Sequence, residues 1–247
     1  MIADGVLTDP APDFAFGLHL WNSKAVGWVG AADGPVMAEQ VNWECVVAGA
    51  GGHAALPHES RDPVVAAAQI VTAIQSVVAR NVDPLHSVVL SVTRIRGGNA
   101  QNVAPGSVML AGTIRTFLPS VRELTLSRLH EVTQGVALAM GCEATLTLSD
   151  PVSPVVNNGE AARQVRQIAG LVSDVKQVAN DERTTVSEDF GDFMADVPGC
   201  FFFVGSANAE GGMSYPHHHP RFDVDERALT IGAELMATVA AQYVLPD

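Results

Sequence analysis

The chain has 247 residues, which is enough for one large domain or two smaller ones. Hydrophobic residues make up 47% of it and charged residues 17%, a composition that can fill a core and argues against extensive disorder. The formal net charge of −13 disfavours nucleic acid as a partner, because an acidic surface repels phosphate backbones.

The targeting signals and the cysteines favour a cytoplasmic, soluble protein. Residues 1–5 have neither the basic stretch nor the apolar stretch of a signal peptide. No apolar run approaches the roughly 20 residues that a membrane-spanning helix needs. Cys45, Cys142 and Cys200 lie far apart and none belongs to a Cys-x-x-Cys pair, so we interpret them as buried thiols in a reducing compartment.

The first elements in chain order are strands and one helix. Residues 1–40 are short apolar runs broken by Gly, Pro and Asp, which predicts strands and loops. Every second residue is apolar in residues 41–47, as in a half-buried strand. Asp62 and Pro63 then have the residue types of a helix N-cap and first turn, and apolar residues at helical spacing continue to Val78.

The middle of the chain continues with two strands, a helix and a strand. Residues 88–96 and 108–117 have the composition of strands, and glycines close the first of them. Ser120 and Glu123 form a capping-box pattern, which predicts the start of a helix there. Residues 142–148 alternate again and predict the last strand of this region.

This order predicts an α/β protein in which one domain interrupts another. The pattern β-α-β-β-α-β over residues 41–154 is that of a ferredoxin-like module, an antiparallel four-stranded sheet with two helices on one face. Residues 155–247 return to alternating helices and strands. Together with residues 1–40 they should form a discontinuous, partial α/β catalytic domain, whose few strands are not expected to close a sheet by themselves.

The histidines are the most informative candidates for chemistry. His19 lies inside an apolar run, where both a hydrogen-bonded core residue and a metal ligand are reasonable. His217, His218 and His219 precede the last helix, and imidazoles at such a junction can form a metal site. His53 follows several glycines, so it is either functional or part of an ordinary loop.

Three other positions have an ordinary structural interpretation. His86 and His130 have polar surroundings and are expected at the surface. Ser187 followed by Glu188 and an aspartate can be a helix N-cap with acidic residues in the first turn.

Six segments in chain order resemble one enzyme family. They are Gly17-Leu18-His19, residues 49–64 (GAGGHAALPHESRDPV), Gln101–Pro105, Gly112–Phe117, Ser187–Phe190 and residues 218–229 (HHPRFDVDERAL). The family is that of the zinc aminoacylase- and carboxypeptidase-like dinuclear metallo-amidohydrolases, in the branch of the hippurate and indole-acetyl-amino-acid hydrolases. The resemblance runs from residue 2 to the end of the chain.

The resemblance implies an α/β domain that holds two divalent metal ions, zinc or manganese or cobalt, and an inserted ferredoxin-like lid through which two copies dimerise. It implies that His19 is a ligand of one metal ion. It implies that His218 is a ligand of the other, since the family has His-x-Pro at this place. Because His217 and His219 are also histidines, it stays open which of the three adjacent residues matches the ligand position of the family.

The resemblance also implies roles for four residues outside the metal shell. His53 would reach the partner subunit's site and polarise the scissile carbonyl. Asn102 would contact the substrate carbonyl or the dimer partner, Arg115 would face the substrate carboxylate, and Glu188 would line the pocket. The implied reaction is hydrolysis of the amide bond of an N-acyl amino acid or peptide-like substrate by metal-bound hydroxide.

The chain departs from the family in its metal ligands. It contains neither a His-Asp nor a Glu-Glu dipeptide, the motifs that supply the general base and most ligands in the family. Asn22 stands where many relatives have proline. We therefore expect an N-terminally truncated chain with an exposed sheet edge, inactive unless a separate N-terminal chain is supplied. The alternative is a non-catalytic dimerisation or interaction remnant.

Overall fold

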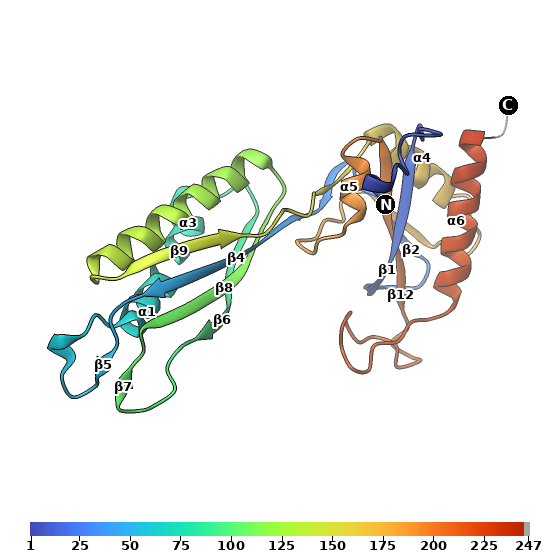
Figure 1. The fold of residues 1–247 in the computed structure, drawn as a ribbon. Coiled ribbons are helices and arrows are strands. Elements are labelled where there is room, and N and C mark those ends of the chain that lie inside the picture. Colours follow the sequence, from blue (N-terminus) through green and yellow to red (C-terminus); the bar gives the residue numbers. More distant parts are fainter. Residues whose placement is uncertain (245–247) are drawn as a thin grey trace. The chain divides into compact units, whose positions relative to one another are not determined.

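The computed structural model describes residues 1–244 and separates into two compact units (Figure 1). Unit 1 comprises Met1–Met37, Ser153–Thr184 and the chain from Glu188 onward, and unit 2 comprises Ala38–Val152 with Thr185–Ser187. The short return to unit 2 was not predicted. Among the contacts that hold this segment to unit 2, the backbone N–H of Ala38 donates to the carbonyl of Val186 at 3.1 Å.

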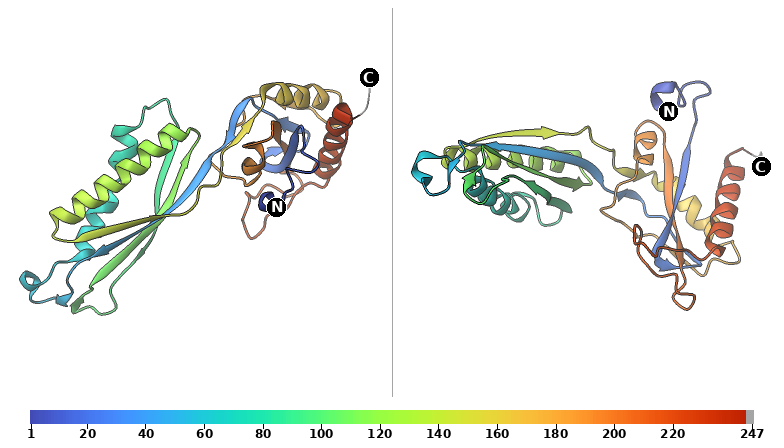
Figure 2. Two further views of the ribbon diagram at one scale, coloured as in Figure 1. Left: turned by 45° about the horizontal axis from the view of Figure 1, so that its top comes forward. Right: turned by 60° about the horizontal axis from the view of Figure 1, so that its bottom comes forward.

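Unit 2 is built on an antiparallel sheet with the strand order β6-β8-β4-β9. Its strands are β4 (Glu39–Ala48), β6 (Val88–Arg96), β8 (Ser107–Thr116) and β9 (Glu143–Leu148). Its helices, α1 (Pro63–Ala73), α2 (Gln75–Asn81) and α3 (Pro119–Ala139), cover one face of the sheet, as both views of Figure 2 show. The element order is the predicted one, except that the first helix divides at Ile74.

The alternation in β4 places one row of side chains in the core of unit 2, as predicted. Val41, Trp43, Cys45 and Val47 are at most 3% exposed, and the residues between them point to the opposite face. They pack against the buried side chains Ile70, Ile74, Leu110, Ile114 and Leu129. The core of unit 2 is therefore closed by its own helices and strands.

The two predicted helix starts in unit 2 have different outcomes. Asp62 caps α1 as expected, because its carboxylate accepts the N–H of Val64 at 2.8 Å. The predicted capping box at Ser120 is wrong: α3 begins at Pro119, and its N-cap residue Leu118 makes no side-chain capping bond. Proline can start a helix by itself, since its fixed φ suits the first turn and its missing N–H has no helical partner there.

The helical stretch Pro63–Asn81 is long and apolar enough to cross a membrane by length and composition alone, with a mean hydropathy of 1.4. The expectation that no such stretch exists is therefore wrong here. The stretch packs Ala66, Ile70 and Val77 into the core of unit 2, where they are fully buried. Core helices of folded domains pass the same test, so this is a weak indication of a membrane segment.

Unit 1 contains a mixed sheet in the order β1-β12-β2-β11. The strands are β1 (Ala15–Ala25), β2 (Trp28–Gly30), β11 (Gln177–Ala179) and β12 (Gly199–Ala207). Within residues 1–244, β1 pairs only with β12, to which it runs parallel. β1 is therefore an edge strand, in line with the expected open edge. A second sheet pairs β3 (Gly34–Met37) with β10 (Val155–Asn157).

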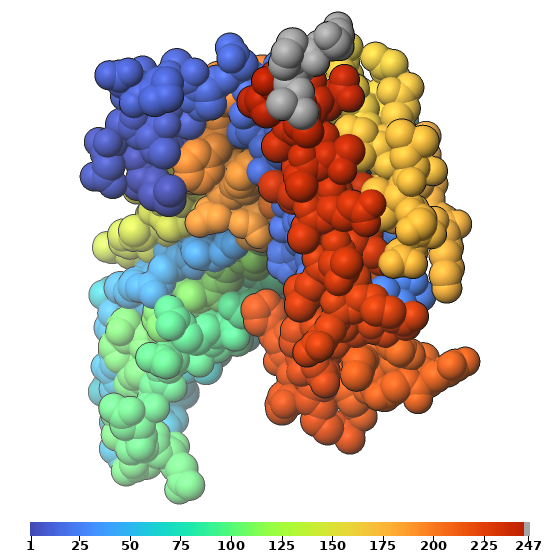
Figure 3. Space-filling model, turned by 90° about the vertical axis from the view of Figure 1, so that its right-hand side faces the viewer, coloured from blue at the N-terminus to red at the C-terminus, as the bar shows by residue number. Residues whose placement is uncertain are grey.

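Helices cover both faces of the central strand β12. Phe202 and Val204 face α4 (Gly159–Ala169) and α6 (Arg227–Val244), which lie side by side on the surface in Figure 3. Phe201 and Phe203 point to the opposite face, toward Trp21 and α5 (Phe190–Met194). The structure thus confirms the predicted buried strand, β12, and the predicted long last helix, α6. β12 is also the strand that pairs with β1, on which His19 lies.

Candidate functional site

His19 and His217 meet beside the edge strand of unit 1. Alternation along β1 puts His19 and Trp21 on one face, and the loop after β12 brings His217 to them. The ring centroids of His19 and His217 are 5.1 Å apart, with the rings nearly perpendicular. Trp21 lies 5.2 Å and Phe222 lies 5.0 Å from the His217 ring, so aromatic side chains wall this imidazole pair.

Both imidazoles bind the same backbone carbonyl. His19 Nδ1 lies 2.6 Å and His217 Nε2 lies 2.9 Å from the oxygen of Leu20. A carbonyl oxygen can only accept, so each of these nitrogens carries a proton. The neutral rings then keep a free lone pair on Nε2 of His19 and on Nδ1 of His217, which is how metal-binding histidines are usually oriented.

The surroundings of His217 favour its neutral form. Burial lowers its pKa, and the nearby His19 and His218 rings lower it further, while the hydrogen bond to Leu20 acts in the opposite direction. A neutral imidazole is the form that a metal ion requires.

Two glutamates lie close to this pair. Burial raises the pKa of Glu188, the neighbouring Asp189 adds to the shift, and His19 is near enough to oppose it. The predicted pocket residue Glu188 thus lies within electrostatic reach of His19. Glu182, which was not predicted, accepts the indole N–H of Trp21 at 3.1 Å and pairs with Lys24 at 2.8 Å. One carboxylate oxygen of Glu182 is held by Lys24, so the other is fixed in place to accept from the indole of Trp21 and orient this ring.

The three adjacent histidines have different surroundings. His218, the predicted ligand, is exposed and has a φ of 66°, in the left-handed region that favours glycine. The His219 ring stacks on Tyr215 with the ring centroids 4.6 Å apart, and the guanidinium of Arg221 lies over the Tyr215 ring at 4.2 Å from its centroid. It is therefore His217 that faces His19 in this structure, and the ligand role of His218 stays a prediction.

The donors present fit only part of a metal centre. Across residues 1–244 there is no group of three or more His, Cys, Asp or Glu side chains arranged to hold a metal ion. The free ring nitrogens of His19 and His217 fit two positions, whereas zinc in a protein takes four ligands, at least three of them from side chains.

His53 and Asn102 come together in unit 2. His53 ends the short strand β5 (Gly52–His53), which pairs with β7 (Val103–Ala104). The N–H of Ala54 donates to the carbonyl of Asn102 at 3.0 Å, and both predicted side chains are exposed. His53 Nδ1 accepts the N–H of Ala55 at 3.0 Å, so Nε2 is the ring nitrogen that can donate outward.

Arg115 is tied to the short return segment of unit 2. Its guanidinium donates to the hydroxyl of Ser187 at 2.6 Å, and Ser187 donates in turn to the side chain of Gln40 at 2.7 Å. The interpretation of Ser187 as a helix N-cap is wrong, because α5 is preceded by Asp189. Ser187 instead orients Arg115.

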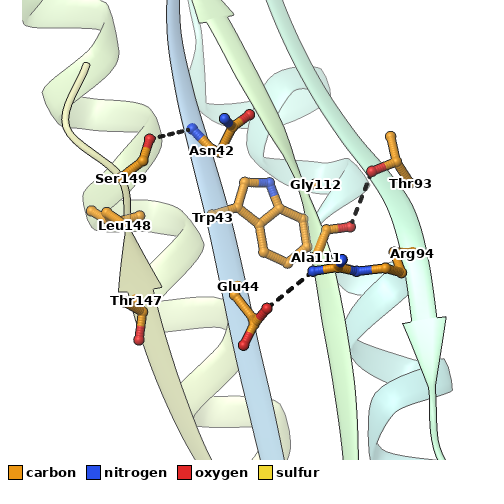
Figure 4. Close-up of a pocket in the computed structure, with 10 residues that line it drawn as sticks. All are labelled: Asn42, Trp43, Glu44, Thr93, Arg94, Ala111, Gly112, Thr147, Leu148 and Ser149. Carbon is orange, nitrogen blue, oxygen red and sulfur yellow. Dashed lines mark hydrogen bonds and ion pairs between the residues drawn. The ribbon is translucent and has the colours of Figure 1, made fainter. Parts of the chain in front are cut away.

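The other side-chain interpretations hold. His86 and His130 are exposed, and all three cysteines are free and buried. A hollow of about 700 Å³ lies on the sheet of unit 2 and includes the Glu44–Arg94 ion pair of 3.1 Å (Figure 4). None of the predicted site residues lines it.

The chain matches the pattern of peptidase family M20/M25/M40 over residues 1–242. N-acetylcysteine deacetylase of Bacillus subtilis is 34% identical to it, over 91% of this chain and 57% of that protein. IAA-amino acid hydrolase ILR1-like 4 of Arabidopsis thaliana is 35% identical, over 93% and 53%. Thermostable carboxypeptidase 2 of Saccharolobus solfataricus is 33% identical, over 98% and 61%.

Solved structures agree with these relatives. An aminohydrolase from methicillin-resistant Staphylococcus aureus superposes with a TM-score of 0.86 at 29% identity, over 98% of this chain and 62% of that one. The YXEP protein of Bacillus subtilis, a dinuclear metal binding peptidase, gives 0.79 at 27% identity, over 98% and 60%. The chain spans 53% to 61% of the curated relatives named above. By its sequence and its fold, this chain belongs to peptidase family M20/M25/M40.

Proposed function

We propose that this chain is the larger part of a metal-dependent amidohydrolase that cleaves the amide bond of N-acyl amino acids. The observation that carries the proposal is the pair of imidazoles, His19 and His217, oriented with free ring nitrogens in a chain of this family. The names of the relatives, a deacetylase and an amino acid hydrolase among them, support this substrate class.

The proposed cofactor is a pair of divalent metal ions, zinc or manganese or cobalt. Such ions polarise a carbonyl group and activate water when they are bound. We propose His19 as a ligand of one ion and His218 as a ligand of the other. His217 is the competing second ligand, and loss of metal from His217→Ala but not from His218→Ala would decide for it.

The remaining roles belong to binding and orientation. We propose that His53 donates a hydrogen bond to the scissile carbonyl, that Arg115 binds the substrate carboxylate, and that Asn102 contacts the carbonyl or the dimer partner. Glu188 would line the pocket. Unit 2 would serve as the lid and as the surface through which two copies associate.

The chain by itself should be inactive. Two imidazoles are a weak zinc site, and the described residues contain no group of three or more His, Cys, Asp or Glu side chains that could hold a metal ion. Solved relatives include a further 38% to 40% of chain that this one does not match. We propose that a segment of this kind supplies the general base and the remaining ligands.

The test is hydrolysis of N-acetylcysteine and hippurate by the purified chain, before and after mixing with the unmatched segment of the Bacillus subtilis deacetylase. We expect activity and about two metal ions per complex only after mixing. His19→Ala should abolish both, whereas His86→Ala, which changes an exposed loop histidine, should change neither. Activity of the chain alone would overturn the claim of inactivity. No activity or metal after mixing would favour the non-catalytic remnant.

A second test addresses the action of His53 in the partner subunit. His53→Ala and His19→Ala chains are each inactive in the mixed system if both residues are needed. Random pairing of the two variants in a dimer restores one working site in half of the dimers, or about a quarter of the wild-type rate. No recovery would show that His53 acts within its own subunit or not at all.

A further inference from the structure

A buried asparagine lies at the base of the histidine loop, residues 215–223. Asn22 follows His19 on β1 and is only 3% exposed. Its side-chain nitrogen donates to the carbonyl of Tyr215 at 2.6 Å and to that of Asp223 at 3.1 Å. Its side-chain oxygen accepts the hydroxyl of Ser206 at 3.0 Å. Both donors of the amide are therefore used, and both go to the same loop.

The two carbonyls lie at opposite ends of the loop that carries the histidines. Tyr215 precedes His217 and Asp223 follows His219, so one side chain closes the loop at both ends. The loop has internal contacts of its own, because the Tyr215 ring stacks on His219 and also contacts the guanidinium of Arg221. A loop whose residues contact one another in this way takes its position from the place where it is attached.

Asn22 and the histidine pair use the same short stretch of β1. The His217 ring reaches the carbonyl of Leu20, to which His19 also binds. Asn22 lies two residues further along the strand and fixes the loop on either side of His217. The loop that carries one imidazole is thus attached to the strand that carries the other through this amide.

We propose that Asn22 is a positioning residue, which sets the place of the His217 ring relative to His19. Because the same loop carries His218, Asn22 thereby also places the second metal ligand, whether that is His218 or its competitor His217. The consequence for metal binding rests on the proposed function. The geometric statement does not, since it can be measured in the metal-free chain.

The same unit offers a matched control. Asn157 is 4% exposed, and its side-chain nitrogen donates to the carbonyls of Ala32 and Phe201, each at 2.9 Å. Its side-chain oxygen accepts the N–H of Phe201 at 2.7 Å. Asn22 and Asn157 therefore make the same number of bonds at the same burial, but Asn157 holds backbone of β12 and of the segment after β2.

Four variants separate positioning from general stability. Asn22→Ala and Asn157→Ala should both lower the melting temperature. Asn22→Asp keeps the size of the side chain and its bond to Ser206 but has no donor for the two carbonyls. Ser206→Ala removes only the bond that Asn22 accepts and leaves both loop contacts intact. These last two changes are small enough to keep the proposal testable if Asn22→Ala does not fold.

The first readout is the ¹⁵N NMR signal of the His217 ring in the metal-free chain at pH 8. We expect the wild type, Asn157→Ala and Ser206→Ala to show one tautomer with a protected Nε2–H. Asn22→Ala and Asn22→Asp should show an exchanging mixture of tautomers. Wild-type signals in both Asn22 variants, or the same change in Asn157→Ala, would overturn the proposal.

The second readout is zinc affinity of the chain mixed with its complementing segment, measured by competition with a chromophoric chelator. We expect the Asn22 variants to bind at least about tenfold more weakly than Asn157→Ala, as is typical when residues that orient ligands are lost. Equal affinities would contradict the proposal. If the wild-type mixture binds no zinc while its His217 signals are ordered, the proposed function fails and the role of Asn22 in positioning stands.

Discussion

Unit 2 and unit 1 differ in how their sheets are completed. In unit 2 all four strands come from one continuous stretch, Ala38–Val152, and the helices that cover the sheet lie between them. In unit 1 the two longest strands, β1 and β12, are far apart in the sequence, and β2 and β11 have 3 residues each. The imidazole pair belongs to the less complete sheet, beside its edge strand.

In unit 1 the histidine pair lies where the sheet has its open edge. The carbonyl and side chains that organise the histidine pair lie on β1, a strand with one partner in the described chain. A further strand or loop along that edge could both complete the sheet and bring donors near His19. Contacts that are distant in sequence also carry a larger entropic cost, so unit 1 should be the first to open.

The largest expected effect is the loss of cooperative folding in unit 1 when the two units are separated. A fragment of residues 38–152 should unfold cooperatively in urea, because it contains the whole unit 2 core. Unit 1 alone, with that stretch replaced by a short linker, should show a weak or non-cooperative transition. Far- and near-UV circular dichroism of both fragments measures this. A cooperative unfolding transition in unit 1 together with a molten unit 2 would contradict the expectation that unit 2 is the unit that folds by itself.

Core truncations should act on one unit at a time. Phe202 in unit 1 and Leu110 in unit 2 are both fully buried. Phe202→Ala should cost about 3–5 kcal/mol and Leu110→Ala about 2–5 kcal/mol, from lost burial and the cavity left behind. Each variant should shift only the unfolding transition of its own unit, as followed by hydrogen exchange. A shift of both transitions by either variant would show that the units unfold together.

The buried thiols report opening of each unit separately. Cys200 lies in unit 1 and Cys45 in unit 2, and burial raises their pKa to about 12 and about 11. Neither thiol is reactive at neutral pH while it is buried, since the thiolate is the nucleophile. We expect an alkylating reagent to label Cys200 faster than Cys45, as read by mass spectrometry of the peptides. Equal rates would indicate opening of the whole chain at once.

Local patterns in the sequence were sufficient for elements whose neighbours lie nearby in the chain. The alternation around Trp43 predicted the buried face of β4, and Asp62 followed by Pro63 predicted the start of α1. Ser120 matched a capping pattern, but the proline before it could start the helix without a cap. Whether a proline or a capping side chain starts the helix depends on the backbone conformation of the residues just before it. The capping pattern holds no information about those residues.

The candidate site was predictable in residue type and not in geometry. The sequence predicts imidazole donors at His19 and in the loop of adjacent histidines, and the structure brings a ring of that loop, His217, to His19. The sequence alone does not show which of the three adjacent histidines faces His19, because the loop that carries them is held by Asn22, which is almost 200 positions away. The only local sign was a polar residue within an apolar strand, and such a residue needs hydrogen-bond partners once it is buried.

The smallest expected effect concerns the acid sensitivity of unit 1. Asp225 precedes α6, and Arg227 donates to it from its guanidinium at 2.6 Å and from its backbone at 3.1 Å. Asn208 donates to the same carboxylate at 2.7 Å. The hydrogen bonds from Arg227 hold the pKa of Asp225 well below its usual range, although burial acts in the opposite direction. The ionised carboxylate therefore stabilises the folded state.

A depressed pKa in the folded state sets the direction of the pH dependence. The stabilisation by Asp225 is fully present above the unfolded pKa of about 3.9 and is lost as the pH falls further toward the folded pKa. Asp225→Asn keeps the shape of the side chain but removes its charge. The variant should therefore melt below the wild type at pH 7, and the gap should narrow between pH 4 and pH 2. The narrowing should appear in the unit 1 transition alone, because Asp225 belongs to that unit.

The more exposed Asp33–Arg166 pair of unit 1, at 2.7 Å, provides the control for this measurement. Asp33→Asn should change stability by less than about 1 kcal/mol, because exposed pairs are screened by solvent. A gap for Asp225→Asn that is constant from pH 7 to pH 2 would show that the hydrogen-bonding shape matters and the charge does not. Any acid sensitivity of unit 1 would then have to come from other carboxylates. The charge of Asp225 would no longer explain a difference in pH dependence between the unfolding of unit 1 and that of unit 2.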